Sequence, residues 1–403
     1  MRQWNDVVVV GAGYAGLAAA LRLHDVGSDV VVVEAADRVG GRTCSEVRPD
    51  GLRVDHGGQW VGPTQEHLLA LTDRFGCETF PTWETGDHIE VWRDGTRVRY
   101  AGTLPESSPG VREYNRVTAL LDDLARTVDT EQPWRTPRFA EWDAQTALTF
   151  FCANTDDEDA LRRLALTIQG VWCAEPDEIS FFHVLFYIAA ASGYRQLMDT
   201  ADCAQDSRFV TGADGPARAI AAHRVIVTLP PTAVRAIDFH PRLPVSRTGW
   251  LSHSPMGRVA KAHVFYAKPF WREAGLSGVA SLYDDGPVGV VFDNSPPDAS
   301  AGVLVAFVYG NRLSAWSALG PGERRAAVLA AVTKVWSWDS FVHGGYEAYS
   351  APGGWTGYGR YGWRMPTGAV HWAGSETASV WNGYIDGAIS SGYRAAEEVL
   401  RDL

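Results

Sequence analysis

Residues 6–16 are DVVVVGAGYAG, a run of four valines that ends in a glycine-rich turn and opens a helix. Gly11 permits the tight turn, Gly13 lets the backbone approach a pyrophosphate, and Gly16 lets the helix pack on the strand. A second apolar strand, residues 29–33, ends at Glu34, which is placed to accept hydrogen bonds from ribose hydroxyls and would repel a 2′-phosphate. Strand, turn, helix, strand and acid, in this order, predict a dinucleotide site and disfavour NADP.

Length and composition are those of a soluble two-domain enzyme. The chain has 403 residues, 46% of them hydrophobic and 21% charged, which is too long for one ordinary core. A net charge of -12 argues against nucleic acid or an anionic membrane as a main partner. We expect no signal peptide, because the first strand begins within ten residues of the start. Five scattered cysteines without metal-site spacing predict reduced thiols in a cytoplasmic protein: Cys44, Cys77, Cys152, Cys173 and Cys203.

Two further glycine pairs follow the second strand. Residues 37–43, DRVGGRT, combine a tight backbone passage with Arg42, a cation suited to a pyrophosphate. Residues 55–62, DHGGQWVG, form another place where backbone could lie against a flat ligand. The first pair taken alone would fit a surface turn equally well.

The remainder of the chain divides by pattern. Helices are predicted at 64–75, through most of 111–194 and at 324–335, and the apolar run 181–191 is expected to be a core helix. A hairpin is predicted at 83–100. Strands are predicted at 224–231, 259–266 and 303–308. A strand at 370–373 should end at Ala373-Gly374, and a helix should begin near Tyr384. The nucleotide domain is therefore expected to use both ends of the chain.

These motifs, in order, resemble the flavin-containing amine oxidases, in particular the monoamine oxidase branch with the bacterial putrescine and tyramine oxidases. The resemblance rests on GxGxxG at 11–16, Glu34, DRVGGRT at 37–43, GGxxVGPTQ at 57–65 and AGSET at 373–377. It covers nearly the whole chain.

The resemblance implies an α/β fold with a discontinuous Rossmann-like FAD-binding domain and an α+β substrate domain, as in p-hydroxybenzoate hydroxylase. We expect the FAD domain at 1–80, 206–250 and 344–403, and the substrate domain at 81–205 and 251–343. The implied reaction oxidises a primary amine to an imine, hence an aldehyde, and reduces oxygen to hydrogen peroxide. The expected partners are a small amine and oxygen, with no nucleic acid, metal or membrane; a homodimer is left open.

The resemblance also assigns residues to the cofactor. Ile385 matches a backbone N–H that meets the flavin pyrimidine carbonyl, at the N-terminus of a helix whose dipole would stabilise the reduced flavin. The full expected FAD set is Gly11, Gly13, Ala15, Gly16, Glu34, Ala35, Arg38, Gly41, Arg42, Gly57, Gly58, Gln59, Trp60, Gly374, Ser375, Glu376, Gly383, Tyr384 and Ile385.

Three residues match the catalytic positions of the family. Lys261, in an otherwise apolar strand, matches the lysine that holds a water near flavin N5. Tyr346 and Tyr384 match the two tyrosines of an aromatic cage that excludes water and tolerates a cationic amine. Less specific matches to the substrate cavity are Gln169, Trp172, Tyr187, Met198 and Gln205.

The chain departs from the family in two respects. Gly345 stands where mitochondrial relatives carry the cysteine bonded to the flavin, so FAD is predicted to be non-covalent. Near Ala222 and near Thr333, stretches that the family carries are missing. Either the protein is shortened at both places or the sequence omits disordered segments.

The substrate itself stays open. An L-amino-acid oxidase would need an arginine to clamp the carboxylate, for which Arg195 is a candidate, although an exposed ion pair suits it better. A polyamine oxidase would need an acidic tunnel. The alternative that is not an enzyme is a flavin-binding subunit without turnover.

Overall fold

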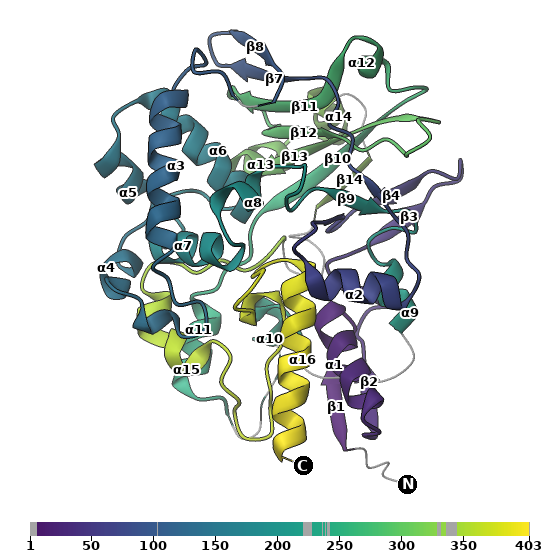
Figure 1. Ribbon diagram of the computed structural model, residues 1–403, viewed down its shortest axis with the longest axis vertical. Coiled ribbons are helices and arrows are strands. Elements are labelled where there is room, and N and C mark those ends of the chain that lie inside the picture. Colours follow the sequence, from purple (N-terminus) through teal and green to yellow (C-terminus); the bar gives the residue numbers. More distant parts are fainter. Residues whose placement is uncertain are drawn as a thin grey trace.

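The computed structural model describes residues 6–102, 104–220, 228–235, 237, 239, 242–328, 332–335 and 345–402. In Figure 1 the lower half of the molecule holds both ends of the described chain, and the upper half holds a large sheet flanked by helices. The expected strand at 224–231 falls mainly outside the described residues, as does the join near Ala222.

The N-terminal motif folds as predicted. Strand β1 (Val7–Val10) pairs in parallel with β2 (Val30–Val33), and helix α1 (Tyr14–Asp25) connects them. The C-terminal helix α16 (Ile385–Asp402) lies along α1 (Figure 1), so the two ends of the chain build one unit. Gly392 of α16 faces Ala15 and Ala19 of α1.

The contact between α1 and α16 leaves no room for a side chain at Gly392. A Cβ there would lie 2.1 Å from the carbonyl oxygen of Ala15. Gly392→Ala is therefore expected to lower the free energy of unfolding by about 1–3 kcal/mol, because the helices must separate. Gly170→Ala in α6 (Glu158–Trp172) is the matched control, since a Cβ there meets nothing within 4 Å. That change should stabilise by up to about 1 kcal/mol through helix propensity. Chemical denaturation compares the two, and equal effects would contradict the packing.

Short elements surround this unit. Strands β3 (Ser45–Val47) and β4 (Arg53–Asp55) form a hairpin, and a small sheet has the order β5 (Trp60–Val61), β9 (Ser207–Phe209), β6 (Thr79–Pro81). The accompanying helices are α2 (Glu66–Arg74), α9 (Gly215–Ile220), α10 (Pro231–Val234), α11 (Val245–Ser252) and α15 (Arg360–Gly362).

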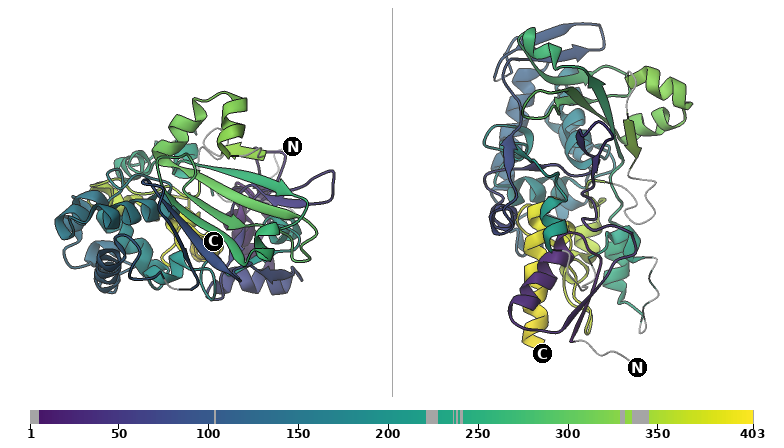
Figure 2. Two further views of the ribbon diagram at one scale, coloured as in Figure 1. Left: turned by 90° about the horizontal axis from the view of Figure 1, so that it is seen from above. Right: turned by 90° about the vertical axis from the view of Figure 1, so that its right-hand side faces the viewer.

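The large sheet has the order β14-β10-β13-β12-β11-β7-β8. Its strands are β7 (Asp87–Trp92), β8 (Arg97–Tyr100), β10 (Val259–Tyr266), β11 (Leu276–Tyr283), β12 (Val290–Asp293), β13 (Gly302–Tyr309) and β14 (Val332–Val335). The predicted hairpin and the strands at 259–266 and 303–308 are thereby confirmed. Helix α12 (Phe270–Glu273) follows β10, while α13 (Gly310–Ser317) and α14 (Pro321–Val328) stand out on one side of the sheet (Figure 2).

The helical region is also confirmed. Its helices are α3 (Val111–Ala125), α4 (Phe139–Asp143), α5 (Ala147–Asn154), α6, α7 (Phe181–Ala190) and α8 (Tyr194–Met198). Helix α7 is buried at nearly every position, so the apolar run is a core helix. Within the described ranges, none of the helices combines the length and apolarity needed to span a bilayer. Cys77, Cys152, Cys173 and Cys203 form no disulfide within the described part of the chain.

Two secondary-structure predictions were wrong. The helix expected at 324–335 ends at Val328, and the β-branched segment 332–335 instead pairs with β10, because an open sheet edge outweighs a helical pattern. The strand expected at 370–373 is absent from the described residues: Val370 pairs locally with Thr367. The predicted domain boundaries stay a prediction.

Candidate active site

One cavity of about 560 Å³ collects the separated motifs. Its wall comes from the first glycine turn, the Glu34 segment, both later glycine pairs and the C-terminal motif. The predicted cofactor residues that line it are Gly11, Gly13, Ala15, Glu34, Ala35, Arg38, Gly41, Arg42, Gly57, Gly58, Gly374, Ser375, Gly383, Tyr384 and Ile385. Tyr346 lines the same cavity.

Four predicted cofactor residues lie behind this wall and support it. A Cβ at Gly16 would lie 2.2 Å from the Gly11 carbonyl oxygen, so this glycine serves the turn itself. Gln59 donates to Asn294 at 2.8 Å, Trp60 stacks on Phe307, and Glu376 binds Arg42.

The Glu34 carboxylate is tied to the glycine turn. Its Oε2 accepts from the Ala12 N–H at 2.6 Å and its Oε1 from the Ala36 N–H at 2.9 Å. These bonds hold the carboxylate at the cavity wall, where a ribose would meet it.

Arg42 joins three segments of the wall. Its Nη1 donates to the Tyr346 carbonyl at 2.8 Å, and its Nη2 donates to Ser375 Oγ and Glu376 Oε2, both at 3.0 Å. Burial would raise the pKa of Glu376, but the charge and hydrogen bonds of Arg42 outweigh it and hold that pKa below its usual range. The pair is therefore ionised at neutral pH.

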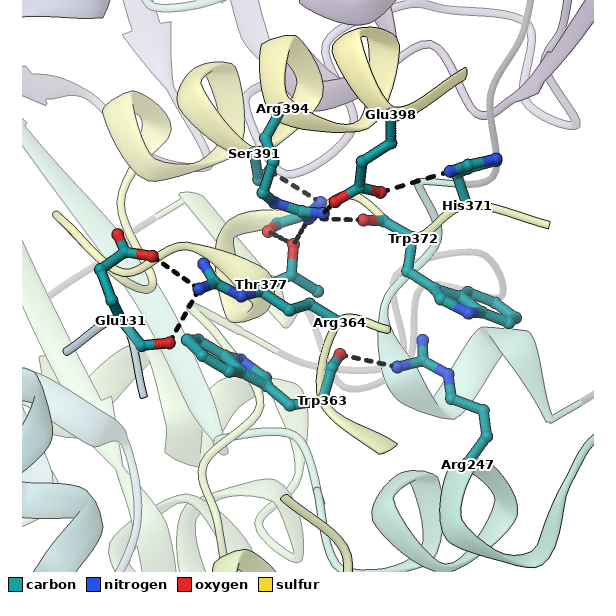
Figure 3. Close-up of polar contacts among 11 residues, drawn as sticks. Glu131, Arg247, Trp363, Arg364, His371, Trp372, Thr377, Ser391, Arg394 and Glu398 are labelled. Carbon is teal, nitrogen blue, oxygen red and sulfur yellow. Dashed lines mark hydrogen bonds and ion pairs between the residues drawn. The ribbon is translucent and has the colours of Figure 1, made fainter. Parts of the chain in front are cut away.

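The C-terminal turn is held by α16 in place of a sheet neighbour (Figure 3). Arg394 donates to the Trp372 carbonyl at 2.7 Å and to Thr377 Oγ1 at 3.2 Å. Ser391 Oγ accepts from the Gly374 N–H at 3.0 Å. These side chains satisfy the Trp372 carbonyl and the Gly374 N–H, and they tie the turn, whose Gly374 and Ser375 line the cavity, to α16.

Lys261 lies behind the second glycine pair. It is 2% exposed, and its Nζ donates to the Gly57 carbonyl and to Gln59 Oε1, both at 2.6 Å. The rings of Trp60 and Phe307 flank the ammonium group at 5.5 and 5.3 Å. Burial lowers the pKa of Lys261 to about 7, against the opposing effect of Asp55. The lysine is thus poised to change its protonation state near neutral pH.

Tyrosines form another part of the site. Tyr346 OH donates to Tyr309 OH at 3.5 Å, and Tyr384 packs edge-on against Trp381. Tyr187 lies 5.9 Å from Tyr384 between ring centroids and 5.1 Å from Trp172. An aromatic cluster therefore continues from the cavity wall into the helical region.

The predicted substrate residues separate into two groups. Trp172 and Tyr187 belong to this aromatic cluster, next to Tyr384. Gln169 instead donates to Glu175, Gln205 donates to the Leu197 carbonyl, and Met198 is 37% exposed. The structure does not bring these three to the cavity wall, and their role stays a prediction. Arg195 forms an exposed ion pair with Asp199.

Sequence reasoning missed two residues. Glu347 is fully buried, and burial and then the nearby Glu376 charge raise its pKa well above the usual value. It packs so tightly on Gly383 that a Cβ there would lie 2.2 Å from its Oε2. Its only sequence signal was an acid directly after Tyr346. Thr228, which lines the cavity and donates to the Gly11 carbonyl, lies at the end of the strand predicted to return to this domain.

The wall suits a dinucleotide. A Cβ at Gly41 would lie 3.2 Å from the Cα of Gly13, so two glycine loops meet where backbone can approach a phosphate. The N-termini of α1 and α16 both open onto the cavity, and helix N-termini favour negative groups. These features fit FAD, with pyrophosphate near Gly13 and Gly41 and the flavin toward Tyr346 and Tyr384.

Comparison with known proteins agrees with this geometry. The family model described as flavin containing amine oxidoreductase matches residues 14–224 and 201–400. A Mycobacterium tuberculosis protein named as a flavin-containing monoamine oxidase is 35% identical, over 98% of this chain and 96% of its own length. Bovine flavin-containing amine oxidase B is 30% identical, over 99% and 86%. The first alignment spans 443 positions against 403 residues, so this chain has gaps relative to that relative.

Solved structures agree as well. Putrescine oxidase bound to putrescine has a TM-score of 0.93 at 30% identity, covering 98% of this chain and 99% of that one. Cyclohexylamine oxidase from Brevibacterium oxydans IH-35A has a TM-score of 0.94 at 30% identity, covering 99% of both chains. With the family model spanning most of the sequence and the cavity built from the same motifs, the chain belongs to the flavin-containing amine oxidases and is an FAD-dependent amine oxidase.

Proposed function

We propose that the substrate is a primary amine that reaches the flavin between Tyr346 and Tyr384, with Lys261 as the catalytic lysine. The observation that carries this proposal is the position of Lys261, whose Nζ is bonded directly behind Gly57 in the wall that also contains both tyrosines. Bound FAD would accept the hydride equivalent from the amine α-carbon.

The chain's own residues prepare the amine for this step. The two tyrosine rings offer π-faces to an incoming ammonium ion and exclude water from it. Lys261, with its pKa lowered to about 7 by burial, is suited to hold a proton or a water molecule beside the reacting centre.

The positions of the arginine side chains favour an amine substrate over an amino acid. Arg195 is exposed and paired with Asp199, so it does not offer a clamp for a substrate carboxylate. Arg42 lines the cavity but is already held by Glu376. A polyamine would require ionised carboxylates along its path, whereas burial disfavours ionisation of Glu347, the buried acid that follows Tyr346 in the chain.

A peroxide assay tests the proposal. The purified protein should show flavin absorption and release peroxide with tyramine or phenethylamine more efficiently than with putrescine, spermidine or amino acids. Faster turnover of amino acids would support the amino-acid alternative, and faster turnover of spermidine the polyamine one. Flavin that no amine bleaches would favour the binding subunit without turnover.

FAD is expected to be released by denaturation. Gly345 has no side chain, and no cysteine is among the residues that line the described cavity. After trichloroacetic acid precipitation the supernatant should be yellow and the pellet colourless. A yellow pellet with a colourless supernatant would show a covalent bond and overturn this prediction.

A further inference from the structure

Strand β10 carries a second titratable side chain beside Lys261. Residues two apart on a strand share one face, so His263 lies on the same face as Lys261. His263 is fully buried, and neither of its ring nitrogens has a hydrogen-bond partner in the described part of the chain. The ring of His56 packs edge-on against it, with 5.9 Å between centroids. His263 thus lies two residues from the lysine on the same strand face and packs against His56.

His56 connects this buried group to the surface. Its Nε2 lies 2.7 Å from Glu46 Oε2, and the Glu46 side chain is 57% exposed while that of His56 is 9% exposed. His56 also stands between Asp55 and Gly57, whose carbonyl oxygens lie 3.4 and 2.6 Å from Lys261 Nζ. Glu46, His56 and His263 therefore form a row of side chains that begins at the surface and ends on the strand that carries Lys261.

Amine oxidation needs such a route. In R–CH2–NH3⁺ + O2 → R–CH=NH2⁺ + H2O2, the ammonium loses one proton before hydride leaves the carbon, and formation of peroxide consumes one. Lys261 is 2% exposed, so a proton exchanged between its ammonium group and solvent has to pass through the protein.

We propose that Glu46, His56 and His263 form a proton path between solvent and Lys261. An imidazole accepts a proton on one nitrogen and releases one from the other, so each transfer leaves the path in its starting charge state. The substrate's proton leaves outward through His56 to Glu46, and the proton for peroxide returns the same way. This inference rests on the amine oxidase function.

The charges around His263 favour passing a proton on over holding it there. Lys261 faces Asp55 from β4 and Arg208 from β9. Burial, and then the positive charges of Lys261, His56, Arg208 and Arg48, lower the pKa of His263 well below its usual value. Protonation of His263 is therefore disfavoured, and a proton is not held there beside the lysine.

Exchange of the lysine protons with water tests the path without turnover. The chain has three lysines, Lys261, Lys268 and Lys334. In ¹⁵N-lysine-labelled holoenzyme, the Lys261 signal is the one lost in Lys261→Met. Below pH 7, exchange of its Nζ protons with water should slow by about tenfold or more in His56→Asn. His67→Asn, an exposed histidine on α2, is the matched control and should leave it unchanged. Wild-type exchange in His56→Asn would overturn the path.

Stopped-flow kinetics provide the second readout. His56→Asn should slow reoxidation by oxygen and raise the solvent isotope effect of that step, without changing the KM for amine; imidazole should restore the rate in His56→Ala. Glu46→Gln, at an exposed position, should slow reoxidation in the same way but to a smaller extent. It tests the path even if the His56 variants lose flavin. Normal exchange and reoxidation in Glu46→Gln and the His56 variants would reject the path. A wild-type protein that oxidises no amine would reject the proposed function instead.

Discussion

Lys261→Met is expected to reduce kcat by about two orders of magnitude while FAD stays bound, as is usual for loss of a group that handles protons in an active site. Methionine keeps the length of the side chain but cannot donate to the Gly57 carbonyl or to Gln59. Because Lys261 does not itself line the cavity, flavin content should stay near that of the wild type. Single-turnover reduction and reoxidation measured by flavin absorbance separate the two half-reactions.

Lys268→Met is the control for this variant, since Lys268 forms an exposed ion pair with Glu273. It should retain wild-type turnover. If Lys261→Met turned over at the wild-type rate, Lys261 would be a structural lysine and the proposed catalytic role would fail.

Lys261→Met should also change how the free energy of unfolding depends on pH. The pKa of Lys261 is about 7 in the folded protein, below its ordinary value of 10.5, so the unfolded chain binds more protons between these limits. Stability attributable to Lys261 therefore rises with pH above 7, by about 1.4 kcal/mol per pH unit. Lys261→Met lacks this slope. The difference in unfolding free energy between the two proteins should change by about 2–3 kcal/mol between pH 7 and 9, and a constant difference would contradict the buried, neutral lysine.

Arg42→Ala is expected to release FAD and to destabilise the fold by about 3 kcal/mol, because it leaves the Glu376 carboxylate buried without its partner. The guanidinium also fastens Tyr346 and Ser375 to the second glycine loop, so three parts of the cofactor wall lose a common anchor. Flavin content per protein and the thermal midpoint, with and without added FAD, measure the two effects.

Two variants sharpen this experiment. Arg42→Lys keeps the charge but not the planar fork, so it should retain part of the stability and bind FAD more weakly than the wild type. Arg74→Ala removes an exposed pair with Asp25 and should cost at most about 1 kcal/mol, with full flavin content. Equal losses in Arg42→Ala and Arg74→Ala would show that the buried pair does not organise the site.

The amino-acid sequence by itself determined the dinucleotide unit and the two ends of the cofactor site. The turn at Gly11 and Gly13, the acid at Glu34 and the helix after Tyr384 are encoded by neighbouring residues, through glycine geometry and the period of the apolar positions. For the same reason the hairpin at 83–100 and the strands around Lys261 and Phe307 were predictable.

Only the tertiary structure decided what supports these motifs. Arg42 meets Glu376 across more than 300 residues, Lys261 reaches Gly57, and Glu347 lies buried against Gly383. No local pattern records such pairings, because they depend on how distant segments pack. The sequence pattern predicted a helix at 332–335, where the structure has a strand, for the same physical reason: pairing with the distant strand β10 outweighed local propensity.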